Sequence, residues 1–223
     1  MVVDPARFVR ENSVLKSPPL VGEIQLHLAD EAIALWQKTE EELERDGLPP
    51  PFWAFAWAGG QALGRYVIDH APLVAGKRVL DFASGSGVSA LAALWCSASH
   101  VVANEIDEFA AAAIHLNADA NHLEAGLEIV LRDMLDEPVM ADDGSSLYDV
   151  VLAGDVCYEK PMADRVIAWL TRHARAGATV LIGDPGRTYL PRDGLEELAR
   201  YSVPTPRELE DQDIRSTRVL HLL

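Results

Sequence analysis

The chain has 223 residues, of which 49% are hydrophobic and 24% are charged, a balance typical of one folded domain. Its 19 basic and 35 acidic residues give a net charge of −16, so its mean field repels nucleic acid and anionic membranes. No apolar run has the length of a membrane helix or a secretory signal, and two cysteines are too few for a disulfide framework or a zinc site. We therefore expect a single soluble domain, residues 1–223, in the cytoplasm and without a metal.

The first 70 residues are predicted to form a helical extension that ends in an aromatic loop. Apolar residues recur at near-helical spacing from Gly22 to Arg45, and a glycine and three prolines end that segment. Residues 52–60 then combine large aromatic side chains with two glycines, and a helix follows. Trp53 and Trp57 in this loop are candidates both for plain core packing and for a ligand site.

From residue 71 onward, short apolar runs alternate with helical segments. Strands are predicted at 78–82, 100–105, 127–131, 148–154 and 178–183, and helices at 88–98, 108–121 and 162–174. Such alternation implies right-handed crossovers and a parallel sheet covered on both faces, so the fold class is α/β. Near the C-terminus, residues 196–200 are predicted to be helical. Residues 201–203 and 216–222 are predicted to be strands, and so short a link requires an antiparallel pair.

A glycine-rich turn, Asp81-Phe82-Ala83-Ser84-Gly85-Ser86-Gly87, joins the first predicted strand of this core to its helix. Glycines at such a turn let the backbone approach a ligand, and the helix N-terminus offers unpaired N–H groups. Glu105 ends the second strand, 20 residues after Gly85, where a carboxylate meets the ribose hydroxyls of an adenosine cofactor. The turn therefore predicts a nucleoside-cofactor site.

Asp81 separates two classes of cofactor that the glycines alone do not distinguish. A carboxylate at the strand end would repel a pyrophosphate, but would attract the amino group and sulfonium of S-adenosylmethionine. Together with the antiparallel last strand, this turn resembles the Rossmann-like S-adenosylmethionine-dependent methyltransferases, which have a seven-stranded, mostly parallel sheet. Ala83 stands where that family usually has its first glycine, and we expect its methyl group to tighten the packing of the turn.

Three separated stretches narrow the resemblance: residues 50–61, the glycine turn, and Gly154-Asp155-Val156-Cys157-Tyr158-Glu159. The last stretch carries an Asp-x-x-Tyr motif directly after the fourth predicted strand. The chain is similar to the seven-strand protein lysine methyltransferases with that signature, and among them to the electron transfer flavoprotein β-subunit lysine methyltransferases. The likeness covers nearly the whole chain, although from Leu195 onward it lies in topology more than in residues.

The resemblance implies which residues bind S-adenosylmethionine. Two would line its methionine end, Trp57 and Gly59. Three would hold its amino acid part, namely Asp81, Gly85 and Gly87. Ribose and adenine would be bound by Glu105, by Asp133 near the adenine amino group, and by Met134 against the ring. On this reading, residues 1–70 form the extension with a cofactor-capping tryptophan loop, and residues 71–223 form the Rossmann-like core.

Asp155 and Tyr158 would contact the substrate lysine. A protonated lysine has no lone pair, so the enzyme must bring a neutral amine to the methyl donor. The sequence leaves open whether Asp155 is a base or an electrostatic clamp, and as a plain alternative it would be the N-cap of the helix that opens at Pro161. Cys157 is expected to be a small buried residue rather than a nucleophile.

The sequence thus predicts an S-adenosylmethionine-dependent protein-lysine N-methyltransferase that acts as a monomer on the electron transfer flavoprotein β subunit. Asp107, as a helix cap, and Asp184, near the substrate mouth, are secondary candidates. Two alternatives stay open: a small-molecule amine N-methyltransferase, and a non-catalytic S-adenosylmethionine-binding module that regulates a partner. A nicotinamide oxidoreductase is a third.

Overall fold

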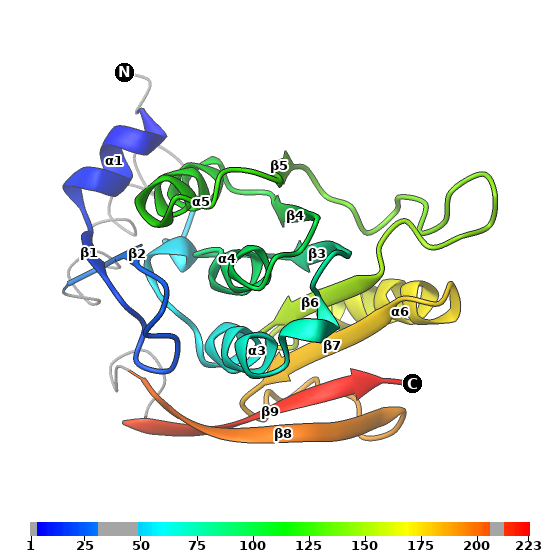
Figure 1. Ribbon diagram of the computed structural model, residues 1–223. Coiled ribbons are helices and arrows are strands. Elements are labelled where there is room, and N and C mark those ends of the chain that lie inside the picture. Colours follow the sequence, from blue (N-terminus) through cyan, green and yellow to red (C-terminus); the bar gives the residue numbers. More distant parts are fainter. Residues whose placement is uncertain (1–3, 31–48, 206–211) are drawn as a thin grey trace.

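The computed structural model describes residues 4–30, 49–205 and 212–223. Its centre is a seven-stranded sheet with the strand order β5-β4-β3-β6-β7-β9-β8 (Figure 1). Five neighbouring strands are parallel: β5 (Leu127–Leu131), β4 (His100–Glu105), β3 (Arg78–Phe82), β6 (Val150–Gly154) and β7 (Thr179–Asp184). The predicted α/β class and the seven-stranded, mostly parallel sheet with its antiparallel last strand are confirmed.

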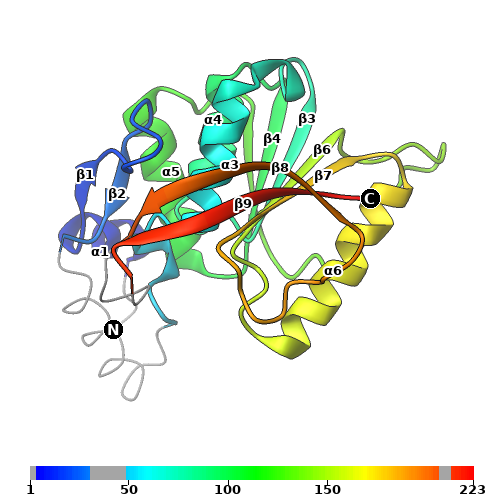
Figure 2. The same cartoon turned by 90° about the horizontal axis from the view of Figure 1, so that it is seen from below.

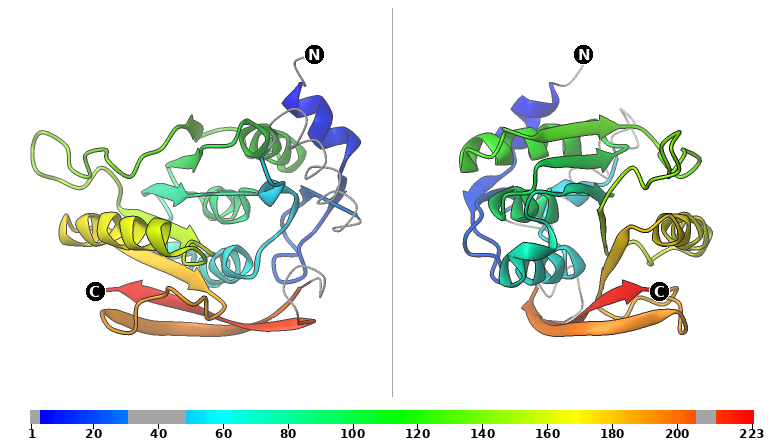
Figure 3. Two further views of the ribbon diagram at one scale, coloured as in Figure 1. Left: turned by 180° about the vertical axis from the view of Figure 1, so that it is seen from behind. Right: turned by 45° about the vertical axis from the view of Figure 1, so that its right-hand side comes forward.

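Helices cover both faces of this sheet (Figure 3). On one face lie α3 (Ala58–Asp69), α4 (Val88–Trp95) and α5 (Glu108–Asn121), and on the other lies α6 (Lys160–Arg175). A short helical turn, η2 (Ala71–Leu73), links α3 to the core. None of the helices in the described ranges combines the length and the apolar character that crossing a membrane requires.

Successive residues of the central strands point into two different cores. Val150 and Leu152 of β6 pack in the core shared with α3 and α4, whereas Val151 and Ala153 pack in the core shared with α6. All four side chains are fully buried. Because helices cover both faces, these strands have continuous apolar sequences instead of an alternation of apolar and polar residues.

The C-terminal part forms two long antiparallel strands, β8 (Leu195–Pro204) and β9 (Ile214–Leu222), which run together along one edge of the sheet (Figure 2). The helix predicted at 196–200 is therefore wrong. These residues have helical propensity, but they pair with β9 through a bulge between Glu197 and Ala199. Backbone pairing along the whole strand outweighs a local preference of a few tenths of a kcal/mol per residue.

The N-terminal part is a short helix, α1 (Pro5–Glu11), followed by the antiparallel hairpin of β1 (Val14–Lys16) and β2 (Leu26–Leu28). The helix predicted from Gly22 is wrong for residues 22–30, and its continuation at 31–45 lies outside the described residues. Ile24, Leu26 and Leu28 are buried at every second position, which is the period of a strand. The same residues also fit part of a helical pattern, so the sequence alone is ambiguous here.

Two asparagines of α5 hold the hairpin through its backbone. Asn121 accepts a hydrogen bond from the N–H of Gln25 at 2.8 Å and donates to its carbonyl at 2.6 Å. Asn117, fully buried, accepts from the N–H of His27 at 2.6 Å and donates to the carbonyl of Ser86 at 2.9 Å. The N-terminal hairpin is therefore connected through one side chain to the glycine turn.

The first turn of α3 lies directly against the ends of β6 and β7. A methyl group added to Gly59 would overlap the carbonyl oxygen of Gly183, and one added to Gly183 would overlap Gly59 and come within 2.8 Å of Leu63 Cγ. A methyl group on Gly154 would meet the nitrogen of Gly60 at 2.9 Å. The helix can occupy this place only because these positions have no side chains.

We therefore expect Gly183→Ala to destabilise the protein by about 3 kcal/mol or more, because the overlapping atoms are backbone atoms that have no alternative rotamer. Gly22→Ala is the matched control, since a methyl group there meets nothing within 4 Å and the change should stay within about 0.5 kcal/mol. Urea unfolding followed by circular dichroism measures both. Equal stability of the two variants would contradict the close contact.

His173 of α6 is a fully buried imidazole packed between aromatic rings. Its ring centroid lies 4.4 Å from that of Trp169 and 5.9 Å from that of Tyr148. Neither ring nitrogen has a hydrogen-bond partner among the residues that the structure describes. Burial lowers the pKa of His173 to about 4, so the native state holds it neutral.

Stability should therefore depend on pH through His173. Below pH 6.5 the unfolded chain binds a proton that the native state excludes, so this contribution is lost as the pH falls from about 6.5 to about 4, by up to roughly 3 kcal/mol. His173→Phe should remove that loss, while the exposed control His115→Gln should keep it. Urea titrations between these pH values test this, and identical pH slopes for wild type and His173→Phe would contradict it.

Candidate active site

The glycine turn lies where β3 ends and α4 begins. Gly85 and Gly87 have φ angles of +55° and +78°, in the left-handed region that glycine adopts without strain. Ala83 has a φ of +52° and is exposed, so the expectation that its methyl group tightens the packing is wrong. Ala83 instead carries a left-handed conformation that costs a residue with a Cβ about 1–2 kcal/mol.

Asp81 is the buried carboxylate at the end of β3, with 2% of its surface exposed. Its Oδ2 accepts a hydrogen bond from the N–H of Ala90 in α4 at 3.0 Å. Burial raises the pKa of Asp81 to about 7, which means that near neutral pH the group gains or loses a proton easily. A ligand ammonium would stabilise the ionised form, so this position fits the amino acid part of S-adenosylmethionine.

Glu105 reaches the same turn from the end of β4. Its Oε1 accepts a hydrogen bond from the N–H of Gly85 at 2.6 Å, and its Oε2 accepts one from the N–H of Ile106 at 3.1 Å. Glu105 therefore contacts the glycine turn, as the spacing of 20 residues predicts. Burial raises its pKa. Each carboxylate oxygen has a second lone pair, which suits the acceptance of ribose hydroxyls. Ile106 beside it is 76% exposed, an apolar surface that sequence reasoning missed.

Asp133 and Met134 follow β5, the strand next to Glu105. Asp133 Oδ1 accepts a hydrogen bond from the N–H of Leu135 at 2.9 Å, and Oδ2 forms an ion pair with Arg165 at 3.3 Å. Met134 is 5% exposed and packs in the core shared with α6. Both residues lie near the cofactor edge of the sheet, and their contacts with adenine stay a prediction.

Asp155 stands at the end of β6 with a φ of +56°. Its Oδ2 accepts hydrogen bonds from the N–H groups of Gly59 at 2.5 Å and Gly60 at 3.2 Å, and its Oδ1 accepts from Arg187 Nη2 at 3.0 Å. The plain interpretation as N-cap of α6 is wrong, because Glu159 occupies that place. Asp155 instead caps α3, whose own N-cap, Trp57, makes no side-chain hydrogen bond to the helix.

Aromatic rings gather beside Asp155. Trp57 Nε1 donates to the carbonyl of Phe52 at 2.9 Å, and the Phe52 ring lies 6.0 Å from that of Trp57 and 6.1 Å from that of Tyr158. Tyr158 is 48% exposed, and burial of its hydroxyl raises its pKa, so the hydroxyl is a donor. Phe52, in the short helix η1 (Phe52–Ala54), was not singled out from the sequence. Trp53, in contrast, is a core residue with 1% exposure.

The turn after β7 supplies a further charged residue. Asp184 Oδ1 accepts from the N–H groups of Gly186 at 2.6 Å and Arg187 at 2.7 Å, so it shapes the turn that carries Arg187. The Arg187 guanidinium lies 5.9 Å from the centre of the Trp57 ring. Sequence reasoning did not identify Arg187 as a site residue. Nothing in the sequence pairs it with Asp155.

Two other expectations are confirmed. Asp107 is the N-cap of α5 and accepts from the N–H of Phe109 at 2.9 Å. Cys157 is fully buried, and burial raises its pKa to about 12, which leaves the thiol protonated and unsuited to act as a nucleophile.

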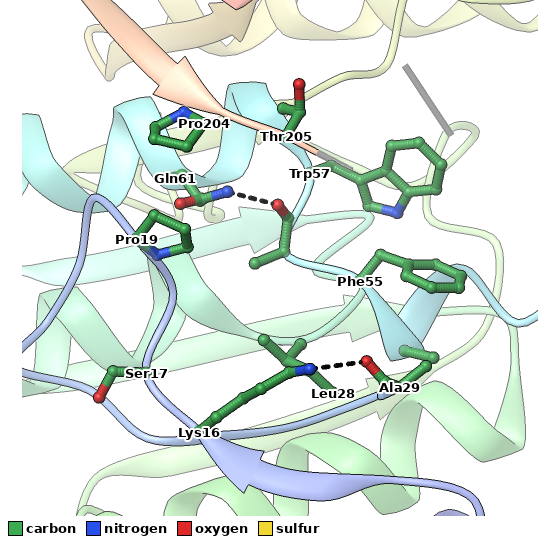
Figure 4. A pocket seen from close by; sticks show the side chains of 12 residues that line it. Lys16, Ser17, Pro19, Leu28, Ala29, Phe55, Trp57, Gln61, Pro204 and Thr205 are labelled. Carbon is green, nitrogen blue, oxygen red and sulfur yellow. Dashed lines mark hydrogen bonds between the residues drawn. The ribbon is translucent and has the colours of Figure 1, made fainter. Parts of the chain in front are cut away.

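A cavity of about 410 Å³ lies beside Trp57, where the N-terminal hairpin, residues 54–61 and the end of β8 meet (Figure 4). Its walls are mostly apolar, and its polar side chains bind neighbouring backbone: Lys16 Nζ donates to the carbonyl of Ala29 at 2.9 Å, and Gln61 Nε2 to that of Ala56 at 2.6 Å. Trp57 is the one predicted site residue among those that line it. The cavity therefore adjoins the site at Trp57 without including the glycine turn.

Comparison with known proteins agrees with this geometry. Residues 63–157 match the family model of ribosomal protein L11 methyltransferase. The electron transfer flavoprotein beta subunit lysine methyltransferase of Danio rerio is 36% identical over 222 residues, which cover 97% of this chain and 82% of the relative. The human protein of that name is 36% identical over 95% of this chain and 79% of the relative.

The chain belongs to the electron transfer flavoprotein beta subunit lysine methyltransferase family. Among solved structures, a proposed SAM-dependent methyltransferase from Streptococcus mutans superposes with a TM-score of 0.56 at 12% identity, over 95% of this chain and 56% of that one. A proposed RNA methyltransferase from Pyrococcus horikoshii has a TM-score of 0.51 at 16% identity, over 73% and 79%. At such identities these structures show the fold alone.

As a member of this methyltransferase family, the protein uses S-adenosylmethionine, which supplies the methyl group when bound. The residues at the glycine turn fit that group, since Asp81 lies buried with a pKa near 7 and no ion pair in the described residues, and Glu105 faces the same turn. We propose that Trp57, Gly59, Asp81, Gly85, Gly87, Glu105, Asp133 and Met134 bind the cofactor.

The raised pKa of Asp81 predicts a pH-dependent affinity for cationic ligands. Lowering the pH from about 7.5 to about 5.5 protonates Asp81 in the free protein, so S-adenosylhomocysteine should bind about ten- to thirtyfold more weakly. Asp81→Asn should bind weakly with a flatter profile, whereas the exposed control Asp119→Asn should behave as the wild type. Isothermal titration calorimetry measures the affinities. A steep profile retained in Asp81→Asn would assign the proton to another group.

Proposed function

We propose that this protein transfers methyl groups from S-adenosylmethionine to lysine side chains of the electron transfer flavoprotein β subunit. The similarity to relatives named for that reaction over 97% of the chain carries the proposal. It is supported by the place of Asp155 and Tyr158 at the carboxyl end of a strand that neighbours the glycine turn. Asp155 accepts from Gly59 in the helix that follows Trp57, and the Tyr158 ring lies 6.1 Å from that of Phe52. Open α/β sheets bind ligands at that edge.

The chemistry requires a neutral lysine in near-attack geometry. Phe52 and Tyr158 are exposed by 40% and 48%, and their rings offer apolar faces that favour the neutral amine and attract a methylated ammonium by cation–π contact. Such faces would help to retain a partly methylated lysine for another transfer. Tyr158 also offers its hydroxyl as a hydrogen-bond donor.

We propose that Asp155 acts as an electrostatic clamp rather than as a base. Both of its oxygens already accept hydrogen bonds, from two backbone N–H groups and from a guanidinium, and such bonds favour the ionised carboxylate over the protonated acid. A carboxylate stabilised in this way binds an arriving ammonium but is a poor acceptor for its proton. We infer that the proton leaves to water.

We also propose that the protein is a monomer, that it is located in the cytoplasm and that it has no nucleic-acid partner. The net charge of −16 supports a positively charged protein partner and opposes nucleic acid. Cys96 and Cys157 are both free and buried, which suits a reducing compartment.

The test is incubation of purified protein and isotopically labelled S-adenosylmethionine with recombinant electron transfer flavoprotein, followed by mass spectrometry of its β subunit. Wild type should methylate lysine, and Asp155→Asn should lower turnover by about a hundredfold or more while it still binds S-adenosylhomocysteine. Asp155→Asn keeps an oxygen that can cap α3. Asp164→Asn, at an exposed position of α6, is the control that should stay active.

Two results would contradict the proposal. Label on another protein but not on the β subunit would discard the substrate, and label on a low-molecular-weight amine would favour the small-molecule alternative. Tight cofactor binding without turnover in any lysate would favour a regulatory binding module.

A further inference from the structure

Arg187 and Asp155 form an ion pair that is largely removed from solvent. The guanidinium and the carboxylate are 3.0 Å apart, and their side chains are 20% and 12% exposed. The backbone of Arg187 is fixed by Asp184, and its guanidinium lies against the Trp57 ring. Removing one partner of such a pair costs more than removing one partner of an exposed pair, because the other charge is left largely desolvated.

The pair matters because the lysine that Asp155 receives must lose its proton. An isolated carboxylate within about 4–6 Å of an ammonium raises the pKa of that ammonium by about 1–3 units, which would hold the lysine in its unreactive form. A carboxylate paired with a guanidinium raises the pKa of a neighbouring ammonium less, because the guanidinium repels that ammonium. Asp155 can then orient the amine without keeping it protonated.

Among the described residues, the neighbourhood also holds charged or titratable groups after β6, at the ends of β7 and β4, and in β9. They include Cys157, Tyr158, Glu159, Asp184, Glu105 and Arg218. Cys157 and Tyr158 stay neutral because burial raises their pKa values. Asp184 is fully buried with Arg187 and Arg218 near it. Within the ranges that the structure describes, Arg187 is the cation that forms an ion pair with Asp155.

We propose, on the basis of the proposed lysine methylation, that Arg187 is a positioning residue that balances the charge of Asp155. It fixes the carboxylate between α3 and the turn after β7, and it lets the bound lysine ionise to the neutral amine near physiological pH. It acts through Asp155 and takes no part in methyl transfer itself.

The first experiment measures single-turnover methylation of the electron transfer flavoprotein β subunit as a function of pH. Arg187→Met should move the midpoint of the rate profile upward by about one unit, so that the rate falls about tenfold near pH 7 and recovers at high pH. Arg187→Lys, which keeps the charge, should stay close to the wild type. Arg200→Met, in an exposed pair with Glu197 on β8, is the matched control and should change nothing.

A second readout needs no turnover. The amides of Gly59 and Gly60 donate to Asp155, so their nitrogen chemical shifts report its ionisation. In Arg187→Met the midpoint of that titration should rise by about one unit, because the carboxylate loses its cation.

The outcomes separate this inference from the proposed function. Wild type that leaves the β subunit unmodified at every pH overturns the substrate, while the amide titration still decides whether Arg187 balances Asp155. Active wild type with an Arg187→Met rate lowered equally at all pH values overturns the inference and assigns Arg187 a purely structural role. An unchanged amide titration in Arg187→Met overturns it as well.

Discussion

The contact between the first turn of α3 and the ends of β6 and β7 is the constraint on which the site depends. The backbones of Gly59 and Gly183 approach so closely that neither residue can carry a side chain. That approach brings the N–H groups of α3 within hydrogen-bond distance of Asp155 and places Trp57 at the edge of the sheet. The aromatic loop and the motif after β6, separated by almost a hundred residues, are thereby brought next to each other.

Backbone N–H groups, more than side chains, hold the carboxylates of this site. Asp81 accepts from an N–H in the first turn of α4, Glu105 from the glycine turn, and Asp155 from α3. These donors carry part of the positive end of a helix dipole, or the same local polarity in a turn, and they do not titrate. They offset part of the cost of placing three acidic groups at one edge of an already acidic protein, and burial still raises the pKa values of Asp81 and Glu105.

Sequence reasoning found the features that depend on neighbours along the chain. The run from Asp81 to Gly87 is a local strand-turn-helix, and adjacent parallel strands bring Glu105 to it by spacing alone. It failed where distant partners decide. Residues 196–200 form a strand because β9 pairs with them. Arg187 forms a hydrogen bond with Asp155, 32 positions earlier in the chain, and no sequence pattern predicts that contact. Residues 22–28 satisfied two periods at once, and the contacts with α5 selected the strand.

Asn117 has a consequence for how this protein can vary. Its amide oxygen accepts a hydrogen bond from the backbone of the N-terminal hairpin, and its amide nitrogen donates one to the backbone of the glycine turn. Both of these partners are peptide groups, so the contacts do not depend on particular side chains. Residues of the hairpin that point to solvent can therefore change freely during evolution while their chain path is kept. The amide itself has no such freedom, because a carboxylate of the same shape would have two acceptors and nothing to donate.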